Sequence, residues 1–387
     1  MEKRSNPASA RPAKPLGDPA KELRALYGLD SRALRDFSLV SPQCSLAFGA
    51  SGIAYALARA GEILHDSEFL LAADAWIEAA EQHAPNKQAF ISLAQGCTRR
   101  KIGFASIVFG EPGLFYVKTM IRSCMGDPAG ADGAARKFLT LSESRLSRVA
   151  DVHLGGLGLA LAAKHLVSCA SSVALRSELS NFSRRIVRRA WVKTGSHIRC
   201  NQVLGFAHGI AGQVFATYAC GDPKLASPIL QQLREMAIPH HRTILWPVRA
   251  GSRDVWTGWC NGVAGHLLMW TKVWQHSRAH DDRELIEQIA RAVWKHQAPL
   301  GSLCCGAAGQ AVALASFSAA TGDHNSRKKT VAWLRSFRPR WPKGSPPQSL
   351  FQGKLGLLLA RVECEHAKRP EFPIYQRDSL SAPMLKN

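Results

Sequence analysis

The chain has 387 residues, 46% of them hydrophobic, and 50 Lys and Arg residues against 29 Asp and Glu give it a formal net charge of +21 at pH 7. This composition excludes an intrinsically disordered chain, and no apolar run reaches the roughly 18–20 residues that cross a bilayer. The positive charge favours an acidic peptide, nucleic acid or a membrane surface as a partner. No basic block interleaved with aromatic residues stands out, so we do not expect nucleic-acid binding. Because no apolar run is long enough, we do not expect stable membrane insertion either.

The first segment, residues 1–24, is basic and rich in Pro and Ala, and it lacks the apolar core of a signal peptide. We therefore predict a disordered N-terminal tail and a cytoplasmic protein. Residues 25–365 are predicted to form one domain, and residues 366–387 to form a C-terminal tail. Since there is no export signal, we do not expect the ten cysteines to form a disulfide framework.

A short cassette recurs through the predicted domain: a glycine, two residues, a second glycine and then an apolar run. The seven copies are FGASGIAYALA at 48–58, FGEPGLFYVKT at 109–119, LGGLGLALAAK at 154–164, HGIAGQVFATY at 208–218, NGVAGHLLMWT at 261–271, CGAAGQAVALA at 305–315 and QGKLGLLLARV at 352–362. Their first glycines lie 44 to 61 residues apart. This regularity indicates a repeat architecture.

Each cassette predicts a sharp loop followed by a buried helix, because glycine permits positive φ and close backbone approach, and the run after it is almost uncharged. The segments between cassettes are amphipathic, for example residues 66–84 and 282–297. Each repeat is thus an inner and an outer helix, which must stack on neighbours to be buried. Seven such hairpins form an open solenoid or a closed ring. Since the inner helices are apolar on most sides, we predict an all-α ring with seven glycine loops around one mouth.

Three cysteines stand at the loops of neighbouring cassettes. Cys260 lies two residues before the first glycine of the fifth copy, and Cys304 and Cys305 directly precede that of the sixth. Three thiols suit Zn²⁺, which prefers sulfur and nitrogen donors, and three protein ligands leave a fourth position open for catalysis. A pair of adjacent cysteines alone is more often part of the hydrophobic core than a metal site. Because the loop that carries this pair is equivalent to the Cys260 loop, we predict a zinc site formed by these three residues.

Two further polar residues precede cassette glycines. His208 directly precedes the fourth, where it is a candidate general acid or base if it faces the mouth and otherwise a hydrogen-bonded structural histidine. Asp151 precedes the third, and it suits helix capping as well as a catalytic role. His153 and His266 lie inside or beside cassettes, and we interpret them as structural.

The cassette series, together with AHG at 207–209, WCNG at 259–262 and CCG at 304–306, resembles the lanthionine synthetase C-like cyclases. The resemblance covers residues 40–362 and implies an α/α toroid of seven helical hairpins. In that family two cysteines and one histidine bind zinc. Here Cys305 stands in place of the histidine, so the chain resembles the three-cysteine subset better known from the cyclase domains of class II lanthipeptide synthetases.

The resemblance implies an enzyme that forms a carbon–sulfur bond. A peptide cysteine thiol adds to dehydroalanine or dehydrobutyrine and closes a lanthionine or methyllanthionine ring. His208 is implied as the acid that protonates Cα of the resulting enolate, and Asp151 as its assistant. The implied partners are a dehydrated precursor peptide, for which the charge of +21 suggests an acidic leader, and a separate dehydratase.

The chain departs from the family pattern next to the first zinc-binding cysteine. The family has an arginine four residues before it, thought to steady the enolate, and Trp256 stands there in this chain. Arg253 lies three residues earlier and is the remaining candidate for that role. The tyrosine often found after the cysteine is replaced by Asn261.

Three rival functions fit part of the sequence. The same chemistry would serve an enzyme that adds glutathione or another small thiol to dehydroamino acids in proteins. A non-catalytic peptide-binding scaffold would instead close its zinc site with a fourth ligand. A toroidal glycosidase needs paired carboxylates at the mouth, and the cassette loops offer only Asp151 and Glu111, so we discount it.

Overall fold

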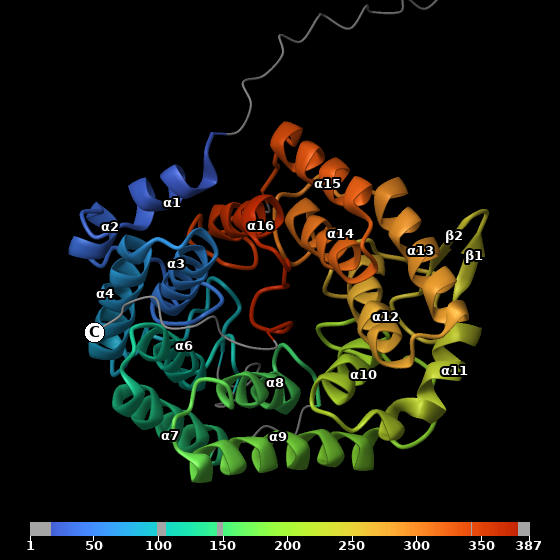
Figure 1. The fold of residues 1–387 in the computed structure, drawn as a ribbon, viewed down its shortest axis with the longest axis horizontal. Coiled ribbons are helices and arrows are strands. Elements are labelled where there is room, and N and C mark those ends of the chain that lie inside the picture. The colour runs from blue at the N-terminus through green and yellow to red at the C-terminus, as the bar shows by residue number, and fades with distance from the viewer. Residues whose placement is uncertain (1–16, 99–105, 145–149, 342, 378–387) are drawn as a thin grey trace, which may run out of the picture.

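The computed structural model describes residues 17–98, 106–144, 150–341 and 343–377, and its helices form two concentric rings (Figure 1). The inner ring consists of the cassette helices α3 (Ala50–Leu64), α6 (Glu111–Cys124), α8 (Gly156–Leu166), α10 (Ile210–Ala219), α12 (Val263–Ser277), α14 (Ala307–Thr321) and α16 (Lys354–His366). Each inner helix contacts the next, and α16 contacts α3, so the ring is closed. The predicted all-α toroid is confirmed.

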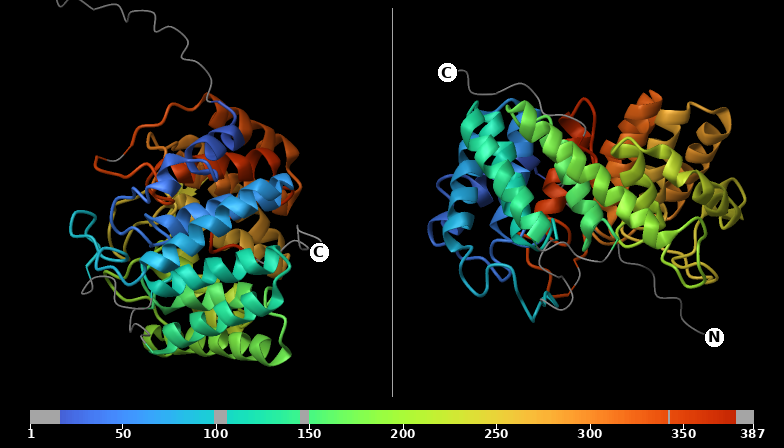
Figure 2. Two further views of the ribbon diagram at one scale, coloured as in Figure 1. Left: turned by 90° about the vertical axis from the view of Figure 1, so that its left-hand side faces the viewer. Right: turned by 90° about the horizontal axis from the view of Figure 1, so that it is seen from below.

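The outer ring consists of amphipathic helices that each follow an inner partner: α4 (Ser67–His83), α7 (Pro128–Ser144), α9 (Val173–Thr194), α11 (Ser227–Glu235), α13 (His280–Lys295) and α15 (His324–Ser336). The seventh inner helix, α16, packs instead against α1 (Pro19–Tyr27), which comes from the opposite end of the sequence. In the side views of Figure 2 the helices run across the thickness of the ring. No helix in the described ranges is long and apolar enough to cross a membrane.

Short elements complete the described chain. The four-residue helix α2 (Arg32–Arg35) follows α1, and the 3-10 helix η1 (Pro223–Ala226) precedes α11. An antiparallel hairpin of β1 (Ile238–His240) and β2 (Thr243–Leu245) packs against α13.

The N-terminal end differs from the predicted tail. Residues 19–24 belong to α1, whose first turn is capped by the Asp18 carboxylate, which accepts a hydrogen bond from Ala20 N over 2.9 Å. Leu23 and Tyr27 are buried, so this helix contributes to the core that the ring encloses. The remainder of the predicted N-terminal tail, residues 1–16, lies outside the described residues.

The C-terminal end differs as well. After α16 the chain turns into the centre of the ring (Figure 1), where Phe372, Ile374 and Tyr375 are buried. We call residues 367–377 the C-terminal insert. Its apolar side chains fill the space that the seven inner helices leave at the axis. Residues 378–387, also predicted as tail, lie outside the described residues.

A buried ion network holds the C-terminal insert in place. Arg59 of α3 donates to Glu363 of α16 over 2.6 Å and to Glu62 over 2.8 Å. Arg377 of the insert, fully buried, donates to the same Glu62 over 2.9 Å and also pairs with Glu371. Buried charges are tolerated only when paired, so the network ties the first inner helix, the last inner helix and the insert together.

A ring of hydrogen bonds joins the seven glycine loops on one face of the toroid. In each loop the residue two positions before the first glycine takes part. The main-chain bonds are Ala47 N to Val108 O (2.8 Å), His153 N to Ala207 O (3.1 Å), Ala207 N to Cys260 O (2.7 Å), Cys260 N to Cys304 O (3.1 Å), Cys304 N to Phe351 O (2.9 Å) and Leu350 N to Ala47 O (2.9 Å). Ser106 Oγ donates to His153 O over 3.0 Å and links the second loop to the third. The seven loops therefore surround one mouth.

The cassette glycines owe their role to close packing and not to positive φ. The first glycine of each copy has φ between −139° and −99°, which any residue adopts. At the second glycine a Cβ would collide with a carbonyl oxygen of the loop, as at Gly212, where it would lie 1.9 Å from Phe206 O. The helix start thus packs directly on the loop before it, which leaves no room for a side chain.

Candidate active site

The three predicted zinc-binding cysteines lie together at the mouth. Cys260 Sγ lies 3.3 Å from Cys305 Sγ, which in turn lies 3.4 Å from Cys304 Sγ, and all three sulfur atoms are within 4.8 Å of one another. The main-chain bond from Cys260 N to Cys304 O fixes the two loops side by side. The structure therefore brings together residues that are separated by more than forty positions in the sequence.

Gly258 allows the two cysteine loops to approach this closely. A Cβ at this position would lie 2.6 Å from Cys305 Cα and 3.1 Å from Cys304 O. Gly205 has the equivalent role one loop earlier, where a Cβ would lie 2.3 Å from Asn261 Cα. These glycines stand four residues before the first cassette glycine, and each makes room for the main chain of the following loop.

The sulfur cluster fits a zinc ion. A tetrahedral site with Zn–S distances of about 2.3 Å places its sulfur atoms roughly 3.8 Å apart. This separation falls between the 3.3 Å from Cys260 Sγ to Cys305 Sγ and the upper limit of 4.8 Å for the three thiols. Hydrogen bonds with Cys260 and Cys304, together with the nearby His208, lower the pKa of the Cys305 thiol to about 4, although burial opposes them. The cluster thus readily holds a thiolate, the form of cysteine that binds metals.

Asp151 and His208 form a pair at the same mouth. His208 Nδ1 lies 3.3 Å from Asp151 Oδ2, and the carboxylate is buried while the imidazole is about one-third exposed. With Nδ1 facing the carboxylate, Nε2 is the nitrogen available for proton transfer. The structure therefore brings together the two residues predicted as acid and assistant.

Asp151 also caps its own loop. Its Oδ1 accepts hydrogen bonds from His153 N and Gly155 N, both 2.9 Å long, and from Leu154 N. Serines fill the same position in four other loops and cap them with a single oxygen: Ser45, Ser106, Ser302 and Ser349. A carboxylate adds a second oxygen, so Asp151 can cap the loop and contact His208 at once.

His153 has a more central place than the sequence suggested. Its ring lies edge-on to the His208 ring with centroids 5.5 Å apart, and it also packs against Phe109 and Phe351. Its Nδ1 lies 3.0 Å from the hydroxyl of Tyr375 in the C-terminal insert. The available signal was the cassette register, since His153 occupies the position that Cys260 and Cys304 occupy in their loops.

The structure does not connect Arg253 with this cluster. Its side chain is exposed, and no hydrogen bond or ion pair found in the described ranges joins it to the cysteines, His208 or Asp151. Trp256 is likewise half exposed, with 51% of its surface accessible. Neither residue therefore supplies a visible counterpart to the family's arginine.

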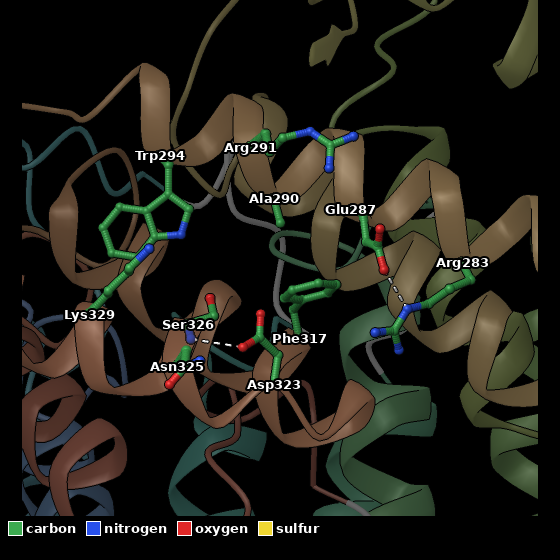
Figure 3. A pocket seen from close by; sticks show the side chains of 10 residues that line it. All are labelled: Arg283, Glu287, Ala290, Arg291, Trp294, Phe317, Asp323, Asn325, Ser326 and Lys329. Atoms are coloured by element: carbon green, nitrogen blue, oxygen red, sulfur yellow. Dashed lines mark hydrogen bonds and ion pairs between the residues drawn. The ribbon is translucent and has the colours of Figure 1, made fainter. Parts of the chain in front are cut away.

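A cavity of about 370 Å³ lies away from the mouth, between α13, α14 and α15 (Figure 3). Three of its charged side chains are already engaged, since Arg283 pairs with Glu287 over 2.8 Å and Asp323 accepts a hydrogen bond from Ser326 N over 3.0 Å. None of the cysteine, histidine or aspartate residues of the mouth lines it. The loops around the sulfur cluster are therefore the stronger candidate for chemistry.

Comparison with known proteins agrees with the toroidal fold. A model of the lanthionine synthetase C-like protein family matches residues 41–376. Among solved structures the chain is similar to nisin cyclase, with a TM-score of 0.68 and 13% sequence identity over 89% of this chain and 94% of that chain. At this identity the likeness concerns the fold. No protein with a curated description matches the sequence.

Proposed function

From the premise that this chain belongs to the lanthionine synthetase C-like protein family, we propose that it is a zinc-dependent cyclase that forms lanthionine or methyllanthionine rings in a peptide. The observation that carries the proposal is the meeting of three cysteine sulfur atoms with the His208–Asp151 pair at one mouth. A thiol-activating metal site and an acid are the two functions that thiol addition to a dehydroamino acid needs.

Cys260, Cys304 and Cys305 are the residues proposed to hold the zinc ion. When bound, the ion would lower the pKa of a peptide thiol so that it reacts as a thiolate at neutral pH, where a free cysteine of pKa about 8.5 is mostly protonated. Three thiolates give the site a net negative charge, which favours a more nucleophilic sulfur than a site with two cysteines and one histidine.

The bond changes can be assigned to residues of the chain. The peptide thiol loses its proton, its sulfur bonds to Cβ of the dehydro residue, and the π electrons move to the carbonyl oxygen as an enolate. His208 then donates a proton to Cα, and the proton released by the thiol restores the imidazole through solvent, so the product has the same mass as the substrate. Asp151 orients the imidazole through its contact with Nδ1.

The proposed substrate is a dehydrated precursor peptide with an acidic leader, made by a separate dehydratase in the cytoplasm. The charge of the chain supports an acidic partner. Residues 179–221, which include most of α9 and the His208 loop, hold six Lys or Arg residues and no Asp or Glu. Arg185 and Arg188 pair with Glu143 and Asp222, and the other four positive charges would attract a peptide whose leader is acidic.

The test is incubation with a dehydrated, cysteine-containing precursor peptide, followed by thiol alkylation and mass spectrometry. Ring closure removes the alkylatable thiol without changing the peptide mass, whereas addition of glutathione, supplied in a parallel reaction, increases the mass by that of glutathione. We expect His208→Asn to keep zinc but to slow ring closure by at least about 100-fold, the usual share of an acid–base group. A peptide that stays fully alkylatable with the wild-type protein would refute the cyclase assignment for that substrate.

A further inference from the structure

The proposed addition places negative charge on a carbonyl oxygen, and a cyclase needs a hydrogen-bond donor there. Removal of one such donor typically slows an enzyme about 10²–10³-fold. Trp256 stands where the family has an arginine, and Arg253 is exposed without a described contact to the cluster. The donor must therefore be sought among other residues of the mouth.

Tyr375 of the C-terminal insert determines how His153 is protonated. Its hydroxyl lies 3.0 Å from His153 Nδ1 and has no other hydrogen-bond partner in the described part of the chain. A buried hydroxyl needs an acceptor, so Tyr375 donates its proton to Nδ1. Nδ1 is then unprotonated, and the neutral imidazole carries its proton on Nε2.

His153 stays neutral at physiological pH. Its burial, together with the nearby His208, lowers its pKa to about 3, although Asp151 opposes this. A neutral imidazole fixed in one tautomer is a pre-organised hydrogen-bond donor, and neutral imidazoles polarise carbonyl groups in other enzymes.

The donor atom remains available at the mouth. In the described residues no hydrogen bond uses His153 Nε2. This nitrogen is also not one of the fully buried side-chain atoms without a partner, so it keeps accessible surface. The His153 and His208 rings are 5.5 Å apart between centroids. An enolate oxygen and Cα are separated by one carbon atom, or about 2.4 Å, so the two imidazoles can serve these neighbouring atoms.

We infer that His153 donates a hydrogen bond from Nε2–H to the enolate oxygen, and that Tyr375 is the positioning residue that holds His153 in this tautomer. The inference rests on the proposed function, and it gives the third loop of the toroid two residues that act in the reaction, Asp151 and His153. It also gives the C-terminal insert a role beyond filling the axis of the ring.

The test compares kcat and KM of variants of the full chain in a steady-state cyclisation assay with varied peptide concentration. We expect His153→Leu to lower the rate about 100-fold with KM changed less than 3-fold, and His153→Gln, whose amide nitrogen can replace Nε2–H, to recover most of that loss. Tyr375→Phe should lower the rate about 10-fold. His266→Leu is the matched control, since it also removes a buried histidine but lies on α12 against Trp246.

Nitrogen-15 NMR of the histidine side chains gives a readout that does not depend on activity. We expect His153 to show the Nε2–H tautomer in the wild type and a mixture of tautomers in Tyr375→Phe. An Nδ1–H tautomer in the wild type, or equal rates for folded His153→Leu and the wild type, would overturn the donor assignment. So would a His153→Gln variant as slow as His153→Leu. If the wild type itself closes no ring while its His153 tautomer is as expected, the proposed function is at fault.

Discussion

His208 Nδ1 and Asp151 Oδ2 lie 3.3 Å apart across 57 residues of sequence, while the other oxygen of Asp151 caps the third loop. One carboxylate thus combines a structural role with the chemical role proposed for it, and two substitutions separate them. Asp151→Ala leaves three main-chain N–H groups without their acceptor and should lower the free energy of unfolding by about 1–3 kcal/mol.

Asp151→Asn keeps an oxygen for the cap but removes the charge beside His208. We expect a loss of less than about 1 kcal/mol in unfolding free energy, measured by urea denaturation, together with slower ring closure. Equal destabilisation by both substitutions would show that the charge, and not the cap, stabilises the loop.

Zinc binding should depend on each of the three clustered cysteines. The purified protein is expected to bind about one Zn²⁺, and Cys304→Ala and Cys305→Ala should each abolish binding, because two thiolates without a third ligand hold the ion poorly. Cys200→Ala is the control, since that cysteine is free and exposed. Elemental analysis after dialysis measures the occupancy, and full occupancy in both variants would rule out the site.

Gly258→Ala tests the packing of the two cysteine loops. The added Cβ would lie 2.6 Å from Cys305 Cα, so the sixth loop must move away from the fifth. We expect zinc affinity to fall at least about 10-fold and stability to fall by about 1–3 kcal/mol. Gly133→Ala on α7 meets nothing within 4 Å and should instead stabilise the helix by up to about 1 kcal/mol. Unchanged zinc affinity in Gly258→Ala would mean that the loops tolerate a wider spacing.

Buried histidines should make the fold sensitive to acid. Burial lowers the pKa of His266 to about 3, and burial also keeps His165 well below its usual range. Between pH 6.5 and pH 3 the unfolded chain binds protons that the folded chain does not, so stability falls as the pH falls, by about 1.4 kcal/mol per histidine and pH unit.

His266→Phe isolates one of these contributions. The phenyl ring can keep the stacking on Trp246, whose ring centroid lies 4.5 Å from that of His266. We expect the variant to lose about 2 kcal/mol less than the wild type between pH 7 and pH 5, measured by urea denaturation at both values. Parallel stability curves for the two proteins would show that His266 is protonated in the folded state.

The sequence predicts much of this architecture because each repeated cassette determines a loop and the inner helix that follows it. The paired glycines and the apolar runs define the seven inner helices, and the shared register of Cys260 and Cys304 places them at one mouth. The same register places His153 at the mouth, although the sequence does not show whether that residue is structural or takes part in the reaction. For Asp151 the predicted capping role is confirmed, and its second oxygen contacts His208, while the catalytic role stays a prediction.

The two segments that complete the ring, α1 and the C-terminal insert, could not be predicted from the periodicity of the sequence. Helix α1 has only nine residues and lacks a cassette, and its partner α16 lies at the far end of the chain. The C-terminal insert has no helical period, and its apolar residues become buried only because a ring with an empty axis exists to receive them. Tertiary context, and not local pattern, determines both segments.

The hydrogen bond from Ser349 Oγ to Ala47 O spans 302 residues. During synthesis, the first loop therefore emerges long before its final partner exists, and each incomplete ring offers two open edges that fit one another. A second chain at the same stage presents the same edges, so domain swapping between nascent copies competes with closure. The speed at which the last hairpin meets the first thus determines how long these edges stay open to such exchange.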